Sequence, residues 1–161
     1  MKPRIKCFFS FDGENYDTVK ASKYGHGVTY GLGNYKGNAF TTGCHAKMRL
    51  DYDCSVKTEI LDMKTMIWSQ AADYPYTKKL VDRVVRTSSN YFNRKIYAYS
   101  ATNTFDTVFI IGGNDTKNTV AMFKNYDWYK LKNLHKGRYN HGSIIFGDKT
   151  IIIGGASEGV L

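Results

Sequence analysis

The stretches Val108-Phe-Ile-Ile-Gly-Gly113 and Thr150-Ile-Ile-Ile-Gly-Gly155 are two copies of one pattern, an apolar strand that ends in a double glycine. Gly112 and Gly154 are 42 positions apart, and a tryptophan, Trp128, lies between the two copies. A period of this size, with one apolar strand and one large aromatic residue per unit, is typical of repeat proteins. Because glycine enters left-handed backbone conformations without strain, each pair predicts a tight reversal of the chain.

The composition favours an all-β fold. Among 161 residues there are 13 Tyr, 9 Phe and 15 Gly, but only 2 Pro. Tyr, Phe, Ile, Val and Thr fit the pleated, half-buried surface of a sheet, and Gly marks turns. The sequence shows no sustained apolar period of an amphipathic helix. We therefore predict an all-β chain that is long enough to form one domain with a core.

A basic residue followed three positions later by a His-Gly pair also recurs. Lys23-Tyr-Gly-His-Gly27 matches Arg138-Tyr-Asn-His-Gly142. A residue that recurs with a repeat usually serves the structure, because an acid–base histidine needs a specific partner rather than a periodic one. We expect the side chains of His26, His141 and Arg138 to hydrogen-bond backbone groups between neighbouring units.

A third match gives the order of strands within a unit. Residues 56–62 and Trp68 pair with residues 119–124 and Trp128, and each pair reads as a strand, a short turn and a strand that bears Trp. Trp68 and Trp128 are expected to pack between neighbouring sheets, where a large aromatic side chain buries most area. One unit then contains a strand after His-Gly, a strand ending in Gly-Gly, an alternating strand and a Trp strand.

This order divides residues 5–155 into repeat units. In the first complete unit, Val28 to Tyr30 is the expected first strand, Gly31 to Gly37 the turn after it, and Thr42 stands where the first Gly of the pair is expected. The Gly31–Gly37 turn leads to a strand, so it lacks the helix N-terminus that a phosphate-binding loop needs. The units are a half unit in 5–19, complete units in 26–70 and 95–131, a half unit in 141–155, and a polar insertion in 71–94.

Together, these motifs resemble the kelch repeat of β-propellers. The resemblance covers residues 5–155 and rests on the Gly-Gly strand, the alternating strand, the Trp strand and the basic-x-x-His-Gly element. It implies four-stranded antiparallel blades that pack radially around a channel. The expected strands make three blades, whereas propellers typically close with four to eight. The chain therefore reads as an incomplete or open arc. We favour a fragment of a longer propeller over a ring closed by a second copy, an alternative that stays open.

Charge and cysteine content narrow the function classes. The net charge of +9 is spread over both halves of the sequence, so we favour a solubility role over non-specific nucleic-acid binding. Cys7, Cys44 and Cys54 are too few for a disulfide framework, and Cys44-His45 lacks the ligands of a structural zinc site. No apolar run approaches the length of a membrane span. We expect no metal, no cofactor and no membrane partner.

The resemblance to kelch propellers implies two functions. One is a non-catalytic scaffold that binds a protein partner through loops on a rigid frame, and the loops 31–37, 44–55 and 102–106 differ most between units. The other is a copper radical enzyme similar to galactose oxidase, although no motif here brings Tyr, His and Cys ligands together. We favour the scaffold. Tyr and Arg are enriched at interface hot spots, so the expected partner contacts in the longest connection are Tyr74, Tyr76, Arg83, Arg86, Tyr91 and Arg94.

Overall fold

The computed structural model describes residues 8–11, 13–19, 22–23, 31–43, 57–76, 99–113 and 116–157. Every regular element in these ranges is a β-strand. The described residues therefore contain no helix that could cross a membrane. The strands are β1 (Phe8–Phe11), β2 (Tyr16–Val19), β3 (Gly31–Tyr35), β4 (Asn38–Thr42), β5 (Thr58–Asp62), β6 (Ile67–Gln70), β7 (Ser100–Asn103), β8 (Thr107–Ile111), β9 (Val120–Lys124), β10 (Asp127–Lys130), β11 (Tyr139–Phe146) and β12 (Lys149–Ala156).

The strands form two four-stranded sheets and two hairpins, all antiparallel. The sheets have the orders β3-β4-β5-β6 and β7-β8-β9-β10, and the hairpins are β1–β2 and β11–β12. Sequential strands are neighbours throughout, as in a meander. The prediction of an all-β chain with four-stranded antiparallel sheets is therefore confirmed.

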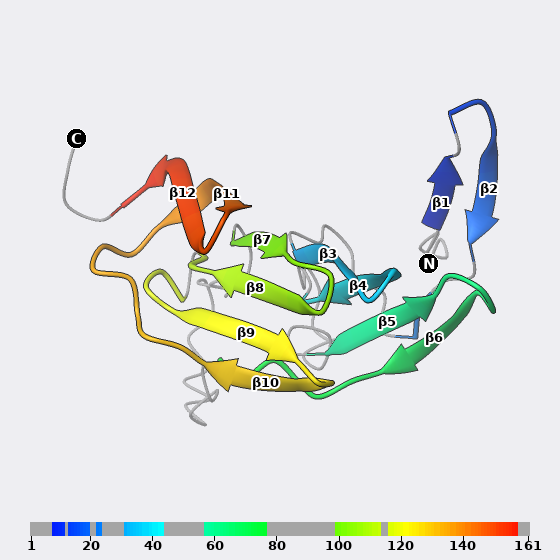
Figure 1. Ribbon diagram of the computed structural model, residues 1–161, viewed down its shortest axis with the longest axis horizontal. Helices are drawn as coiled ribbons and strands as arrows, with labels where there is room; N and C mark the ends of the chain where they lie inside the picture. Colours follow the sequence, from blue (N-terminus) through cyan, green and yellow to red (C-terminus); the bar gives the residue numbers. More distant parts are fainter. Residues whose placement is uncertain are drawn as a thin grey trace, which may run out of the picture.

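The first strands of successive sheets lie together. β3 packs against β7 and β8, and β7 packs against β11. The two hairpins lie at opposite ends of the molecule, with β1–β2 at the end that carries the N-terminus and β11–β12 at the other (Figure 1). The order along the molecule is thus hairpin, sheet, sheet, hairpin.

Register shows which residues are equivalent in the two sheets. Trp68 lies opposite Leu61, and Trp128 lies opposite Phe123. Counting back from these pairs makes Thr42 equivalent to Ile111 and Gly43 equivalent to Gly112.

The backbone supports the same equivalence of the two glycines. Gly43 and Gly112 both have positive φ, 72° and 65°. The N–H of Gly43 donates to the Lys57 carbonyl at 3.3 Å, and that of Gly112 donates to the Thr119 carbonyl at 2.8 Å. The expectation that Thr42 replaces the first glycine is therefore wrong by one position.

The expected first strand, Val28 to Tyr30, lies outside the described residues, but the turn expected after it differs from the structure. The expected turn from Gly31 to Gly37 begins with a strand, β3, and only Lys36 and Gly37 make the turn, with φ of 52° and 79°. A Cβ at Gly33 would lie 3.3 Å from Cγ1 of Val108, tighter than an ordinary contact. Gly33 thus serves the close approach of two sheets rather than a chain reversal.

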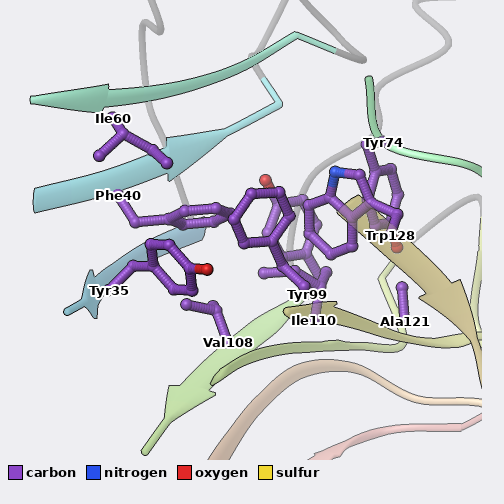
Figure 2. Close-up of a cluster of buried hydrophobic side chains, with 10 residues drawn as sticks. Tyr35, Phe40, Ile60, Tyr74, Tyr99, Val108, Ile110, Ala121 and Trp128 are labelled. Atoms are coloured by element: carbon purple, nitrogen blue, oxygen red, sulfur yellow. The ribbon is translucent and has the colours of Figure 1, made fainter. Parts of the chain in front are cut away.

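The core lies between the two four-stranded sheets. Figure 2 shows Tyr35, Phe40 and Ile60 from the first sheet facing Val108, Ile110 and Trp128 from the second. The rings meet edge-on: the centroids of Phe123 and Trp128 are 5.1 Å apart, and those of Tyr35 and Phe123 are 5.0 Å apart. Edge-to-face contacts of this kind add to the free energy of area burial. The buried cluster is Tyr35, Phe40, Ile60, Tyr74, Tyr99, Val108, Ile110, Ala121, Phe123 and Trp128.

Candidate partner-binding surface

Tyr74 lies in the core and not on a surface. Its side chain is only 2% exposed, and its ring stands edge-on to Trp128 at 5.0 Å. The segment that carries it is fixed to both sheets, because the Ala71 N–H donates to the Thr58 carbonyl at 2.9 Å and the Trp128 indole N–H donates to the Ala72 carbonyl at 2.9 Å. Burial raises the pKa of Tyr74. Since no partner can reach this ring, the expectation that Tyr74 is a contact residue is corrected.

Tyr76 is half-buried against the second sheet. Its hydroxyl donates to the Val120 carbonyl at 3.3 Å, and the Lys130 ammonium lies 5.1 Å from the ring centroid. Part of this side chain remains open to a partner. The other expected contacts, Arg83, Arg86, Tyr91 and Arg94, lie outside the described residues.

The two tryptophans differ in burial. Trp128 is buried, and its indole N–H also lies 3.2 Å from the Thr58 hydroxyl. Trp68 holds the same register position in the first sheet but is only half-buried. In the register, Trp68 shares a face of the first sheet with Leu61, opposite to the face on which Ile60 joins the core between the two sheets. Trp128 thus packs between two four-stranded sheets, whereas Trp68 is the less buried of the two tryptophans.

The paired glycines meet Arg138 and His141. Gly112, Gly113, Gly154 and Gly155 all have positive φ. The Arg138 carbonyl accepts the Gly113 N–H at 2.9 Å, while the Arg138 guanidinium donates to the Gly154 carbonyl at 3.0 Å. Arg138 therefore connects the glycine pair of β8 with that of β12.

His141 is buried without the hydrogen bonds that the sequence predicts. Neither of its ring nitrogens has a hydrogen-bond partner among the described residues. The ring instead fills the space left by glycine, since a Cβ at Gly112 would lie 2.8 Å from its Cε1. Burial of the ring, and next to it the positive charge of Arg138, lower the pKa of His141.

The residue equivalent to His141 in the second sheet is Tyr99. The register places Ser100 and Gly142 at the same position, and Tyr99 packs on Gly43 as His141 packs on Gly112. The Tyr99 hydroxyl donates to the Thr42 carbonyl at 2.5 Å, and burial raises the pKa of this phenol. In the first sheet the register gives the place of Gly142 to Gly31, not to Gly27. His26 itself lies outside the described residues.

An exposed aromatic surface joins three turns of the two sheets. We call it the turn patch and define it as Lys36, Phe105 and Tyr126, which lie over the buried ring of Tyr35. The side chains of Phe105 and Tyr126 are 73% and 55% exposed. The Lys36 ammonium lies 5.3 Å from the ring centroids of both Tyr35 and Tyr126, and the Lys36 N–H donates to the Phe105 carbonyl at 2.6 Å. Lys36 thus connects the two sheets at this surface.

The backbone of the turn patch is strained. The turn between β9 and β10 has positive φ at both central residues, Asn125 (52°) and Tyr126 (64°). Such turns usually contain Asn-Gly, and a bulky residue in this conformation costs about 1–2 kcal/mol. The buried Tyr35 holds Tyr126 in place, since its hydroxyl accepts the Tyr126 N–H at 3.3 Å and the two rings meet edge-on. Strain of this kind is concentrated at functional sites.

Charged groups beside the turn patch are ordered as well. Lys124 and Asp106 form an ion pair at 3.3 Å. Hydrogen bonds from Thr107 and from Lys124 lower the pKa of Asp106. The residues that the structure describes contain no group of three or more His, Cys, Asp or Glu side chains that could hold a metal ion.

The sequence pointed to part of this surface. Phe105 and Lys36 lie in two of the loops, 102–106 and 31–37, that differ most between units. Tyr126 was missed because it lies in the short turn between β9 and β10, and no residue next to it in the sequence indicates a binding surface. Only the packing of two sheets brings the three turns together.

Comparisons of the sequence with family models and with curated proteins give no match. Among solved structures, the chain is similar to one titled "Structure of YjhT", with a TM-score of 0.63 at 16% identity over 88% of this chain and 47% of that one. The chain thus spans about half the length of that structure. At this identity the likeness concerns the fold alone. The chain is an all-β protein of four-stranded antiparallel sheets, with a fold like that of half of the YjhT structure.

Proposed function

We propose that the chain is an arc of a kelch-type β-propeller and serves as a non-catalytic scaffold for a protein partner. The repeated register supports the propeller arrangement: Gly43, Gly112 and Gly154 hold equivalent positions, and all have positive φ. The adjacency of β3, β7 and β11 is what radial packing of blades requires. The similarity to the YjhT structure agrees with it.

The turn patch carries the functional part of the proposal. Phe105 and Tyr126 present large aromatic surfaces to solvent, and aromatic residues are enriched in protein interfaces. Their base is rigid, because the patch stands on the buried Tyr35 and on hydrogen bonds between the sheets. A rigid aromatic anchor loses little conformational entropy on binding.

The chemistry of the patch selects the partner. Phe105 offers an apolar contact, and Lys36 offers a cation held between two tyrosine rings. A protein segment with an apolar side chain next to a carboxylate fits both. The excess of basic residues in the chain would also speed association with an acidic partner.

The test is to recover partners on the immobilised chain and to measure the affinity of each recovered protein for defined variants. Phe105→Ala and Lys36→Glu remove the apolar contact and the cation, and both side chains are exposed, so the fold is retained. Ile67→Ala is the matched control, since Ile67 is an exposed apolar residue on β6 outside the patch. We expect the patch variants to weaken binding by about ten-fold or more, the usual scale of a hot-spot residue. Equal affinity for all variants would overturn the turn patch as the binding surface.

A further inference from the structure

One face of the β11–β12 hairpin is apolar and open to solvent. Ile144 lies opposite Ile151, Gly142 lies opposite Ile153, and Phe146 lies opposite Lys149, so these residues share a face of the hairpin. The exposed fractions are 54% for Ile144, 74% for Phe146, 43% for Ile151 and 64% for Ile153. Contiguous apolar surface of this kind is rare on a free monomer and marks an interaction site.

The same hairpin has an unused strand edge. Among the described residues β12 pairs with β11 alone, whereas its equivalent β8 pairs with β7 on one side and with β9 on the other. At the opposite end of the molecule, β1 pairs with β2 alone in the part of the chain that the structure describes, whereas β9 pairs with both β10 and β8. An unpaired edge is a template for strand addition.

The two hairpins are complementary parts of one four-stranded sheet. In β1–β2, Phe11 lies opposite Tyr16 with four residues between them, the same spacing as Phe123 and Trp128 in β9–β10. Gly154-Gly155 lies near the end of β12 and holds the register position of Gly112-Gly113, which directly follows β8. Thus β11–β12 supplies strands one and two of a sheet, and β1–β2 supplies strands three and four.

We propose that a second copy of this chain covers the apolar face and the open edge, with β12 of one copy pairing with β1 of the other. Both junctions of such a pair are equivalent, so each copy completes a four-stranded sheet of the other. Two full sheets per copy and two shared sheets make six, within the four to eight that close a propeller. The inference rests on the propeller arrangement proposed above, but it does not use the turn patch.

Geometry favours a second copy over an unrelated partner. The two hairpins lie at opposite ends of the molecule, so one copy cannot satisfy both edges by itself (Figure 1). The strand that would be added, β1, has the apolar sequence Phe-Phe-Ser-Phe, which suits the apolar hairpin that it meets.

The register of the shared sheet follows from the complete one. Phe109 lies opposite Met122 in β8–β9. Ile151 is equivalent to Phe109 and Ser10 is equivalent to Met122, so Ile151 of one copy lies opposite Ser10 of the second copy. Directly opposed residues in antiparallel strands have Cα atoms about 4.5–5.5 Å apart, within reach of a disulfide.

Cysteine cross-linking tests this register between two distinguishable copies. Ser10→Cys and Ile151→Cys are made in separate chains in which Cys7, Cys44 and Cys54 are replaced by Ser, and the two chains are mixed and oxidised. We expect a cross-linked dimer from the mixture and none from either chain alone. Ile144→Cys is the matched control: it lies on the same face but one strand farther, about 10 Å from the site, and should not cross-link.

The solution mass of the unmodified chain, by light scattering, is the independent measurement. We expect a dimer that converts to monomer in Ile151→Lys. Ile67→Lys changes an exposed apolar residue on β6 and should leave the dimer intact. A monomer at every concentration with no cross-link would overturn the proposal, and so would an open ladder of larger species. The Phe105→Ala variant separates the proposal of a partner at the turn patch from the proposal of a dimer. It should lose partner binding and still form the dimer.

Discussion

The second four-stranded sheet and the β11–β12 hairpin have similar sequences but opposite surroundings. Ile111 and Ile153 occupy the same register position, directly before a double glycine. Ile111 is 2% exposed and Ile153 is 64% exposed. The apolar pattern of a repeat strand therefore shows what the strand can bury, while the next unit decides whether burial occurs.

The largest loss of stability is expected from Trp128→Ala in the second four-stranded sheet. This change removes a buried indole that contacts Phe40 and Phe123 and donates a hydrogen bond to Ala72. We expect a loss of about 3–5 kcal/mol in the free energy of unfolding, measured by urea denaturation. The equivalent change Trp68→Ala in the first sheet should cost less than half as much, because Trp68 is only half-buried. Equal losses would show that Trp68 is as well packed as Trp128.

A smaller effect is expected from glycine substitution. Gly112→Ala introduces both positive-φ strain and overlap with the Arg138 carbonyl oxygen and the His141 ring, at a cost of about 2–4 kcal/mol. Gly147→Ala in the β11–β12 turn has similar φ, 61°, but open space around its Cβ, so it isolates the strain at about 1–2 kcal/mol. Thermal unfolding of both variants measures the difference. If Gly147→Ala costs as much as Gly112→Ala, the close approach of Arg138 and His141 contributes nothing.

The hydrogen bond of Tyr99 gives the third comparison. Tyr99→Phe leaves the buried Thr42 carbonyl without this donor and should cost about 1–2 kcal/mol in the free energy of unfolding. Tyr129→Phe on the exposed strand β10 is the control and should be neutral. A neutral result for Tyr99→Phe would mean that water or another group satisfies Thr42.

The smallest effect is the pH dependence that His141 adds. The folded state lowers the pKa of His141, so protonation favours the unfolded chain. Stability contributed by neutral His141 is present above the ordinary histidine pKa of about 6.5 and is lost as pH falls below it. Unfolding midpoints between pH 7.5 and pH 5 should therefore fall less in His141→Phe than in the wild type. The exposed His135→Gln variant should follow the wild-type curve, and parallel curves for all three would contradict the assignment.

Parts of the fold were readable in the sequence because the signals are local. The Gly-Gly strands, the Trp strands and the turn composition predicted β-sheets of four strands with the right order. The start of β3 was missed because glycine serves both in turns and where two strands approach closely. Gly33 permits the close approach of Val108, and no local sequence pattern distinguishes this use from a turn. Tyr74 was misplaced for a similar reason, because its burial depends on Trp128, which lies far along the chain.

The sequence by itself determined that this protein is all-β, that its strands form four-stranded antiparallel sheets, and which aromatic residues recur with the repeat. These properties depend on residue composition and on short local patterns that recur along the chain. Only the tertiary structure decided which apolar faces are buried and which turns meet. Lys36, Phe105 and Tyr126 form one surface because two sheets pack together, and Ile144 and Ile151 stay exposed because no sheet in the described chain covers them. Burial depends on neighbours that are distant in sequence, so no local pattern could show it.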